Sequence, residues 1–148
     1  MLLRRDRAMT AVAIVLDVAF HAGRTETVNA AEIAERLGLA RRGIEPVMQA
    51  LSRAELLKSV RGPGGGYRLG RSRREIRLSD IAAAVSEDES AEPVAQGRLA
   101  TAVVEPLWAE MEAAARKAMA AITVEDLLRR AAAAGMKRAA TEPLNFAI

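Results

Sequence analysis

The residues with the clearest binding chemistry are arginines that lie close to a glycine-rich segment. Arg41 and Arg42 open a predicted helix, and Glu45 follows one turn later. Arg61 stands directly before four glycines and one proline in residues 62–66. Arginine bonds phosphate or the O6 and N7 edge of guanine, glutamate accepts from the cytosine amino group, and a narrow minor groove attracts arginine. These residue types at this spacing predict contacts with duplex DNA.

Catalytic and metal-binding chemistry finds no support in the sequence. The chain has no Cys and a single His, His21, at the end of a predicted helix, where a histidine favours the helix dipole. The glycine-rich segment matches neither the phosphate-binding loop of nucleotide enzymes nor the dinucleotide-binding pattern. The acidic run Glu87–Glu89 is typical of a solvated loop rather than of a cation site. The sequence therefore predicts a binding protein, not an enzyme, with no metal site.

Two short helices are predicted in this region, and the second of them contains Arg41 and Arg42. Asn29, with an acidic residue three positions later, is typical of a helix N-cap, and this first helix is predicted to end at Gly38. The second helix is predicted to begin near Arg42 or Gly43, which places Pro46 in its first turn. Two helices joined by a glycine turn indicate a helix-turn-helix.

A β-hairpin is predicted directly after these helices. Residues 56–60 and 67–69 can form strands, and the glycine-rich segment between them can only form a turn. Residues 71–74 are predicted to be a flexible basic exit, followed by a helix over 78–85. The fold class is therefore mostly α with a small β-hairpin wing, a winged helix-turn-helix whose second helix fits a major groove.

The C-terminal half is predicted to form a long helix and a short one. An acidic loop over 87–98 separates it from the winged domain of residues 1–86. The helices occupy residues 99–135, where Pro106 marks a kink or the true beginning of the long helix, and a disordered tail is expected over 136–148. Apolar residues at helical spacing along the long helix indicate a core or a dimer seam. They are Val104, Leu107, Trp108, Met111, Ala115, Met119 and Ile122.

The charge of the chain is unevenly divided along its length. Residues 1–77 contain 15 Lys and Arg against 8 Asp and Glu, whereas residues 78–148 contain 7 against 11. A basic first half suits a polyanionic partner, and the second half suits protein or solvent. No apolar run approaches the roughly 18 residues of a membrane span, and the N-terminus has no secretory cleavage pattern. A cytoplasmic protein without membrane contact is therefore expected.

Two segments resemble a known family. Residues 61–69, Arg-Gly-Pro-Gly-Gly-Gly-Tyr-Arg-Leu, and residues 31–38, Ala-Glu-Ile-Ala-Glu-Arg-Leu-Gly, are similar to the IscR/BadM-type bacterial winged helix-turn-helix transcriptional regulators. The resemblance implies a homodimer in which residues 99–135 are dimerisation helices, the long one crossing to the partner, and operators of dyad symmetry. The candidate DNA contacts, from the family's positions and from the hairpin itself, are Arg41, Arg42, Glu45, Ser59, Arg61, Gly62, Gly64 and Arg68.

The chain departs from this family in two places. Many members hold an iron–sulfur cluster on three Cys in the loop after the fourth helix, but residues 87–98 contain neither Cys nor His. Because such clusters need thiolate ligands, no cluster and no other cofactor is expected. The second helix also has Ala40, Gly43 and Pro46 where members often carry a Ser, an aromatic residue and a Gln, so their operator preference does not transfer.

The function expected from these features is sequence-specific binding of double-stranded DNA by a homodimeric repressor. Two alternatives stay open. One is a protein-interaction module on the winged-helix scaffold, which salt-insensitive binding would favour. The other is a regulator that responds to a small-molecule effector, with a pocket between the fourth helix and Trp108, and this alternative is compatible with DNA binding.

Overall fold

The computed structural model describes residues 5–23, 26–86 and 93–137. Within these ranges it has six α-helices, one π-helical turn and a two-stranded antiparallel sheet, which confirms the predicted fold class. The elements are α1 (Arg5–His21), α2 (Ala30–Leu37), α3 (Arg41–Arg53), β1 (Leu57–Val60), β2 (Gly66–Leu69), α4 (Leu78–Ser86), η1 (Ala100–Val104), α5 (Glu105–Ala120) and α6 (Val124–Ala133). None of the helices in these ranges is both long and apolar enough to cross a bilayer.

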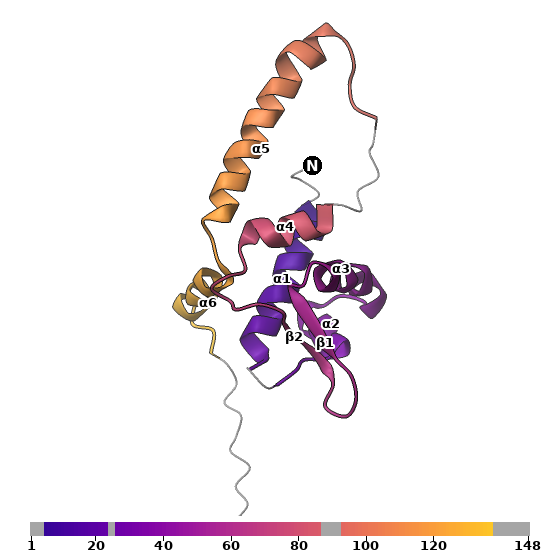
Figure 1. Cartoon of the computed structure of the whole chain (residues 1–148), viewed down its shortest axis with the longest axis vertical. Helices are drawn as coiled ribbons and strands as arrows, with labels where there is room; N and C mark the ends of the chain where they lie inside the picture. Colours follow the sequence, from indigo (N-terminus) through magenta and orange to yellow (C-terminus); the bar gives the residue numbers. More distant parts are fainter. Residues whose placement is uncertain (1–4, 24–25, 87–92, 138–148) are drawn as a thin grey trace, which may run out of the picture.

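Helices α1 to α4 and the hairpin form one body, from which α5 extends (Figure 1). α6 returns to lie beside α1, and its Val124 is buried in the same core. The last helix therefore completes the N-terminal body. Residues 87–92 of the acidic loop and residues 138–148 of the tail that was expected to be disordered lie outside the described residues.

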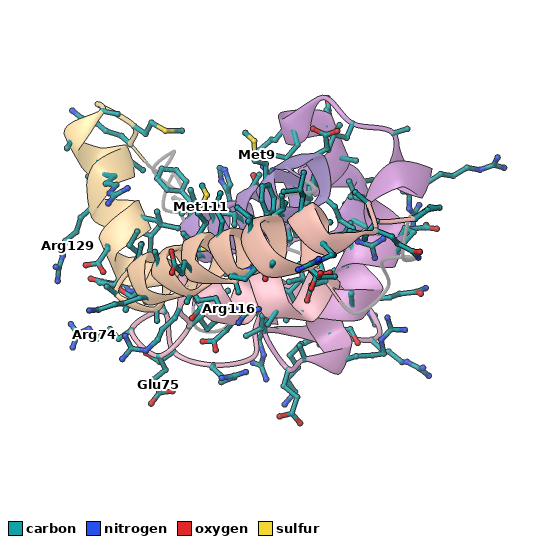
Figure 2. The ribbon with its side chains drawn as sticks, turned by 90° about the horizontal axis from the view of Figure 1, so that it is seen from above. Met9, Arg74, Glu75, Met111, Arg116 and Arg129 are labelled. Carbon is teal, nitrogen blue, oxygen red and sulfur yellow. The ribbon has the colours of Figure 1, made fainter. Side chains whose placement is uncertain are left out.

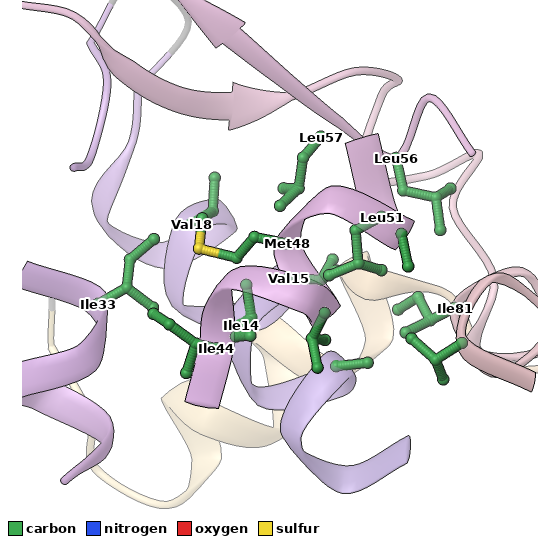
Figure 3. Packing of buried hydrophobic residues seen from close by; sticks show 14 of the residues in the cluster. Ile14, Val15, Val18, Ile33, Ile44, Met48, Leu51, Leu56, Leu57 and Ile81 are labelled. Carbon is green, nitrogen blue, oxygen red and sulfur yellow. The ribbon is translucent and has the colours of Figure 1, made fainter. Parts of the chain in front are cut away.

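The hydrophobic core joins α1 to α3 and to the hairpin. Ile14 and Val18 of α1 share one cluster with Ile44 and Met48 of α3, and all four are at most 1% exposed (Figure 3). Leu57 of β1 packs in the same cluster. Burying a side chain of this size contributes about 1.5–3 kcal/mol, so the core fixes which face of α3 points inward and leaves the opposite face to solvent.

α2 begins and ends where the sequence predicts. The Asn29 Oδ1 atom accepts from the backbone N–H of Glu32 at 2.9 Å, and the Glu32 carboxylate accepts from the N–H of Asn29 at 3.4 Å. Gly38 ends the helix with a φ of 65°, a left-handed conformation that glycine adopts easily. The predicted capping of α2 is confirmed, and it fixes the helix that precedes α3.

A partly buried ion pair joins α1 to α2. The Nε and Nη2 atoms of Arg36 each lie 2.9 Å from one carboxylate oxygen of Asp17, a residue that is 9% exposed. Hydrogen bonding to Asp17 raises the pKa of Arg36 above its ordinary value. His21, the last residue of α1, has its Nε2 atom 3.7 Å from the same carboxylate. The single histidine therefore lies at a helix end, as the sequence predicts.

Removing the arginine of this pair is expected to destabilise the fold. In Arg36→Ala, the Asp17 carboxylate would stay largely buried without its two charged hydrogen bonds. Because the Arg36 side chain is 33% exposed, we expect a moderate loss, about 2 kcal/mol in the free energy of unfolding. Urea unfolding measures the change, and Arg61→Ala, which removes an exposed arginine of the hairpin, is the control. An unchanged midpoint for Arg36→Ala would contradict a stabilising role for the pair.

The segment between the hairpin and α4 is tied to the end of α5. The N–H of Val124 donates to the carbonyl oxygen of Ile76 at 2.9 Å, and the Arg77 guanidinium donates to the carbonyl oxygen of Ala120 at 2.7 Å. Arg77 also pairs with Thr123 in an isolated antiparallel bridge. The long helix is therefore connected to the body at its C-terminal end.

The prediction of a flexible exit over residues 71–74 is wrong. The Nη2 atom of Arg71 donates to the carbonyl oxygen of Ala54 at 3.2 Å, and the Nε atom of Arg73 lies 2.6 Å from Oε2 of Glu125. These partners are far away in the sequence, so no local pattern reveals them. The exit is a defined connection between the hairpin, α3 and α6.

α6 begins with a capping arrangement of its own. The Asp126 carboxylate accepts from the backbone N–H of Thr123 at 2.9 Å and from its hydroxyl at 3.0 Å. The backbone N–H of Asp126 in turn donates to the Thr123 hydroxyl oxygen at 3.2 Å. The hydrogen bonds from Thr123 lower the pKa of Asp126. Because this pKa is lower in the folded protein, the cap stabilises α6 above the ordinary pKa of aspartate and is lost as the pH falls through the lowered value.

The long helix begins where the sequence predicts. Arg98 and Leu99 are already helical, a π-helical turn follows over Ala100–Val104, and α5 continues directly from Glu105, whose N–H donates to the carbonyl oxygen of Ala100. Pro106, the second residue of α5, has no N–H to donate and comes directly after this wider turn. Pro106 therefore lies within a continuous helix and does not mark its beginning.

Candidate nucleic-acid interface

The face of α3 that lies opposite the core is polar and exposed. Ile44, Met48 and Leu51 are buried on the inner face of the helix. The outer face presents the three helix residues predicted to contact DNA and one polar residue that was not predicted. They are Arg41, Arg42, Glu45 and, as the additional residue, Gln49.

Arg41 and Glu45 form an ion pair one helical turn apart. The Arg41 Nε atom lies 3.5 Å from the Glu45 Oε1 atom, and the two side chains are 66% and 53% exposed. An exposed pair of this kind contributes little to stability, but it keeps a donor and an acceptor side by side on the surface. Arg42 is exposed next to them. All three predicted helix contacts are therefore accessible to a partner.

Pro46 lies in the second turn of α3, and its predicted place in the first turn is wrong. The helix begins at Arg41 because the N–H of Gly43 donates to the carbonyl oxygen of Ala40 at 2.9 Å and closes an early turn. An N–H at position 46 would donate to the carbonyl oxygen of Arg42. Because Arg42 is exposed, water can bond that carbonyl oxygen, so a proline is tolerated this close to the helix start.

The connection from α3 to β1 fixes the hairpin relative to the helix. The N–H of Leu56 donates to the carbonyl oxygen of Leu51 and the N–H of Glu55 to that of Ser52, both at 3.0 Å. This two-bond pattern commonly ends helices and usually has glycine where Glu55 stands. Glu55 has a φ of 59°, and a Cβ on the neighbouring Gly70 would lie 2.2 Å from its carbonyl oxygen. The two hydrogen bonds therefore fix the junction, in which Glu55 has a strained conformation and the backbone of Gly70 lies close to that of Glu55.

Glu55→Gly is expected to stabilise the protein. A left-handed conformation costs a non-glycine residue about 1–2 kcal/mol, and part of the gain is offset by the greater freedom of glycine in the unfolded chain. We expect the free energy of unfolding to rise by about 1 kcal/mol, measured by thermal unfolding. Glu35→Gly, inside α2, is the control and should destabilise the fold. A loss of stability in Glu55→Gly would show that the glutamate side chain makes a compensating contact.

The tip of the hairpin is anchored to the residues that precede α2. The N–H of Val28 donates to the carbonyl oxygen of Tyr67 at 2.9 Å, and the N–H of Tyr67 donates back to that of Val28 at 2.7 Å. The Thr27 hydroxyl donates to the carbonyl oxygen of Gly64 at 2.6 Å. The tip that carries Arg61 and the start of β2 are therefore held by contacts with Thr27 and Val28.

The glycines of the tip have two different roles. A Cβ on Gly65 or on Gly66 would lie 2.4 or 2.7 Å from a backbone carbonyl oxygen, so the hairpin itself requires these two glycines. Gly62 and Gly64 have positive φ values of 97° and 73°, and a Cβ there would meet nothing within 4 Å. Only these two, which the sequence predicts as DNA contacts, present open backbone surface to a partner.

A depression of about 430 Å³ lies between α3, the start of α2 and β2. Its wall includes Arg41, Glu45 and Gln49 from α3 and Gly66 and Tyr67 from β2. The structure therefore brings Arg41 and Glu45 together with β2 on one surface, whereas Arg42 and the predicted hairpin contacts are not among the residues that line it.

The other predicted contacts are distributed along the hairpin. Ser59 and Arg61 are exposed. Arg68 lies opposite Lys58 in the antiparallel register. Because side chains alternate along a strand, Arg68 is on the opposite face of the hairpin from Tyr67 and is turned away from the depression.

The chemistry of this surface suits a polar partner. Arginine side chains only donate, the Glu45 carboxylate only accepts, and the Gln49 amide does both. Within the part of the chain that the structure describes, no three His, Asp or Glu side chains gather as metal ligands would. The surface can therefore bind through charge and directional hydrogen bonds.

α5 presents an apolar stripe that the described part of its own chain leaves uncovered. Leu107, Trp108 and Met111 are 51%, 43% and 56% exposed, and no residue of α5 is buried. Met111 and Arg116 extend to opposite sides of the helix (Figure 2). Because Leu107 and Trp108 precede Met111 by four and three residues, they lie on the same side of α5 as Met111. Of the other predicted interface residues, Val104 is exposed, and Ala115, Met119 and Ile122 are half-buried.

The proteins that this chain resembles in sequence are regulators of transcription. A family model described as "Rrf2: Iron-dependent Transcriptional regulator" matches residues 5–130. The HTH-type transcriptional regulators IscR of Sodalis glossinidius and Vibrio atlanticus are 44% and 43% identical to it over 81 residues. The match covers 55% of this chain and 48% and 46% of those relatives, so the chain spans about half the length of the curated relatives.

Solved structures match a larger share of the chain. IscR from T. potens has a TM-score of 0.72 and 30% identity, covering 90% of this chain and 90% of that one. CymR, described as the global cysteine regulator of B. subtilis, has a TM-score of 0.69 and 25% identity, covering 88% of this chain and 98% of that one.

Proposed function

The chain belongs to the Rrf2 family of transcriptional regulators, and on that basis we propose that it binds duplex DNA in a sequence-specific manner. The observation that carries the proposal is the common surface of helix and hairpin, on which Arg41 and Glu45 lie beside Gly66 and Tyr67. A helix about 10–12 Å across fits a major groove about 12 Å wide. A hairpin next to that helix can reach the adjacent minor groove.

Each exposed contact has a role that its chemistry supports. Arg41 and Arg42 reach phosphates or the O6 and N7 atoms of guanine, and Glu45 accepts from the amino group of cytosine. Arg61 enters the minor groove, where a narrow groove has the most negative potential. Gly62 and Gly64, whose backbone surface is open, allow the hairpin to approach the sugar-phosphate wall.

We further propose that the protein acts as a homodimer and represses by occluding a promoter. The uncovered stripe of α5, with Leu107, Trp108 and Met111, supports the dimer, because exposed apolar patches of this kind mark protein interfaces. A two-fold dimer presents two α3 helices to a pseudo-palindromic operator whose half-sites lie about one helical turn apart. A protein that binds the chromosome in this way works in the bacterial cytoplasm.

An iron–sulfur cluster does not fit this chain. The family description names iron, yet the sequence has no Cys, and such clusters are held by thiolates. The Nε2 atom of the single histidine, His21, lies 3.7 Å from the carboxylate of Asp17 on the same helix. We therefore propose that this chain regulates without a cluster and that its effector, a small molecule or a protein, has other chemistry.

Selection of bound sequences from random duplexes, with the full chain, tests the proposed function. We expect enrichment of one pseudo-palindrome, and an affinity for it whose logarithm falls with the logarithm of salt by about 0.9 for each phosphate contact. A shuffled duplex of the same composition is the control in the titration. No enrichment, together with salt-insensitive binding to a protein partner, would instead favour the protein-interaction module.

A further inference from the structure

We propose that Gln49 reads an A·T base pair in the major groove and so determines part of the operator sequence. The inference rests on the proposed function, because it assigns a base contact on the same surface of α3. It adds a residue that the sequence pattern does not single out.

Gln49 continues the line of Arg41 and Glu45 along α3. The three residues are four positions apart, so they lie at successive turns on one face of the helix. All three are exposed, and all three line the depression shared with β2. With a rise of roughly 1.5 Å per residue, Gln49 lies about 6 Å beyond Glu45, which corresponds to about two base-pair steps. A helix placed to bring Glu45 to a base therefore brings Gln49 to a nearby one.

The amide of Gln49 is available for such a contact. Arg41 and Glu45 are paired with each other at 3.5 Å, whereas the side-chain amide of Gln49 makes no hydrogen bond with the residues that the structure describes. A glutamine amide offers both an acceptor and donors. Adenine presents the complementary pair, a donor at N6 and an acceptor at N7, in the major groove. The chemistry of Gln49 therefore favours adenine over the other three bases.

A purely structural role does not explain the position of Gln49. The neighbouring Met48 fills the core, while Gln49 points away from it and is exposed. The competing interaction is a hydrogen bond from the amide to a phosphate oxygen, which would carry no base preference. Base preference therefore separates the two possibilities.

Selection from random duplexes with the full chain and two variants tests the inference. The wild type is expected to enrich adenine at one position of each half-site. Gln49→Ala is expected to lose the preference at that position alone, with about a tenfold loss of discrimination against other base pairs. Gln49→Glu is expected to change the preferred base there to cytosine, because a carboxylate can accept a hydrogen bond from the cytosine amino group.

The chain provides a matched control for this experiment. Gln96→Ala removes the other glutamine, which is exposed in the segment before η1, and should give the wild-type selection profile. Affinity for non-specific duplex and its salt slope should be unchanged in Gln49→Ala, because no charge is removed. If the wild type enriches an operator and Gln49→Ala gives the same profile, or weakens all sequences equally, the inference is wrong while the proposed function stands. If the wild type enriches no sequence, the proposed function itself is wrong.

Discussion

Arg61→Ala is expected to weaken binding to the operator by about tenfold or more. Arg61 is exposed at the start of the hairpin tip. The Thr27 hydroxyl donates to the carbonyl oxygen of Gly64 at 2.6 Å and fixes the tip, so the tip loses little conformational entropy when DNA binds. A groove contact made by an arginine contributes about 1–3 kcal/mol. A dimer would lose one such contact in each half-site. Fluorescence anisotropy with a selected duplex measures the change.

The salt dependence of the same titration shows which kind of contact is lost. If Arg61 neutralises phosphate charge, the salt slope becomes shallower by about 0.9 for each subunit. The control is Arg74→Ala, which removes an exposed arginine from the exit segment, beside Glu75 and away from the α3 surface (Figure 2). Its affinity is expected to stay within about twofold of wild type. Equal losses in both variants would indicate that overall charge, and not the hairpin tip, drives binding.

The helix-turn-helix and the hairpin could be predicted because their signals are local. Asn29 and Gly38 mark the ends of α2 through backbone chemistry that operates within a few residues. The glycines before Tyr67 leave the chain no alternative to a turn. For the same reason, the sequence alone predicts the two elements that are proposed to bind DNA.

The features that sequence reasoning missed depend on contacts between distant segments. The ion pair of Arg73 with Glu125 and the bond from Arg77 to Ala120 join segments more than forty residues apart. No periodicity or composition encodes such partners. An exposed glutamine likewise gives no sequence signal of a binding role. Gln49 becomes a candidate base contact only because β2 lies beside α3 and the two share the depression that Gln49 lines. The elements that form the site could therefore be predicted from the sequence, but not all of the residues that line it.

Leu107→Glu is expected to convert the protein to a monomer and to reduce operator affinity severely. Leu107 lies within the apolar stripe of α5, where it is 51% exposed. A two-fold interface contains every substituted residue twice, so the variant would bring two carboxylates into an apolar seam, and burying unpaired charge is strongly unfavourable. Without a dimer the two half-sites no longer act together, which lowers affinity by about 10²–10⁴-fold.

Light scattering measures the assembly, because the wild type should have twice the mass of one 15.8 kDa chain and the variant the mass of one. Ala113→Glu is the matched control, since it adds the same charge to the opposite, exposed face of α5 and should change neither mass nor affinity. Circular dichroism checks that both variants keep their helices. If Leu107→Glu stays dimeric, the stripe is not the interface. If it becomes monomeric but binds the operator as tightly as the wild type, one α3 and one hairpin suffice, and dyad symmetry is not required.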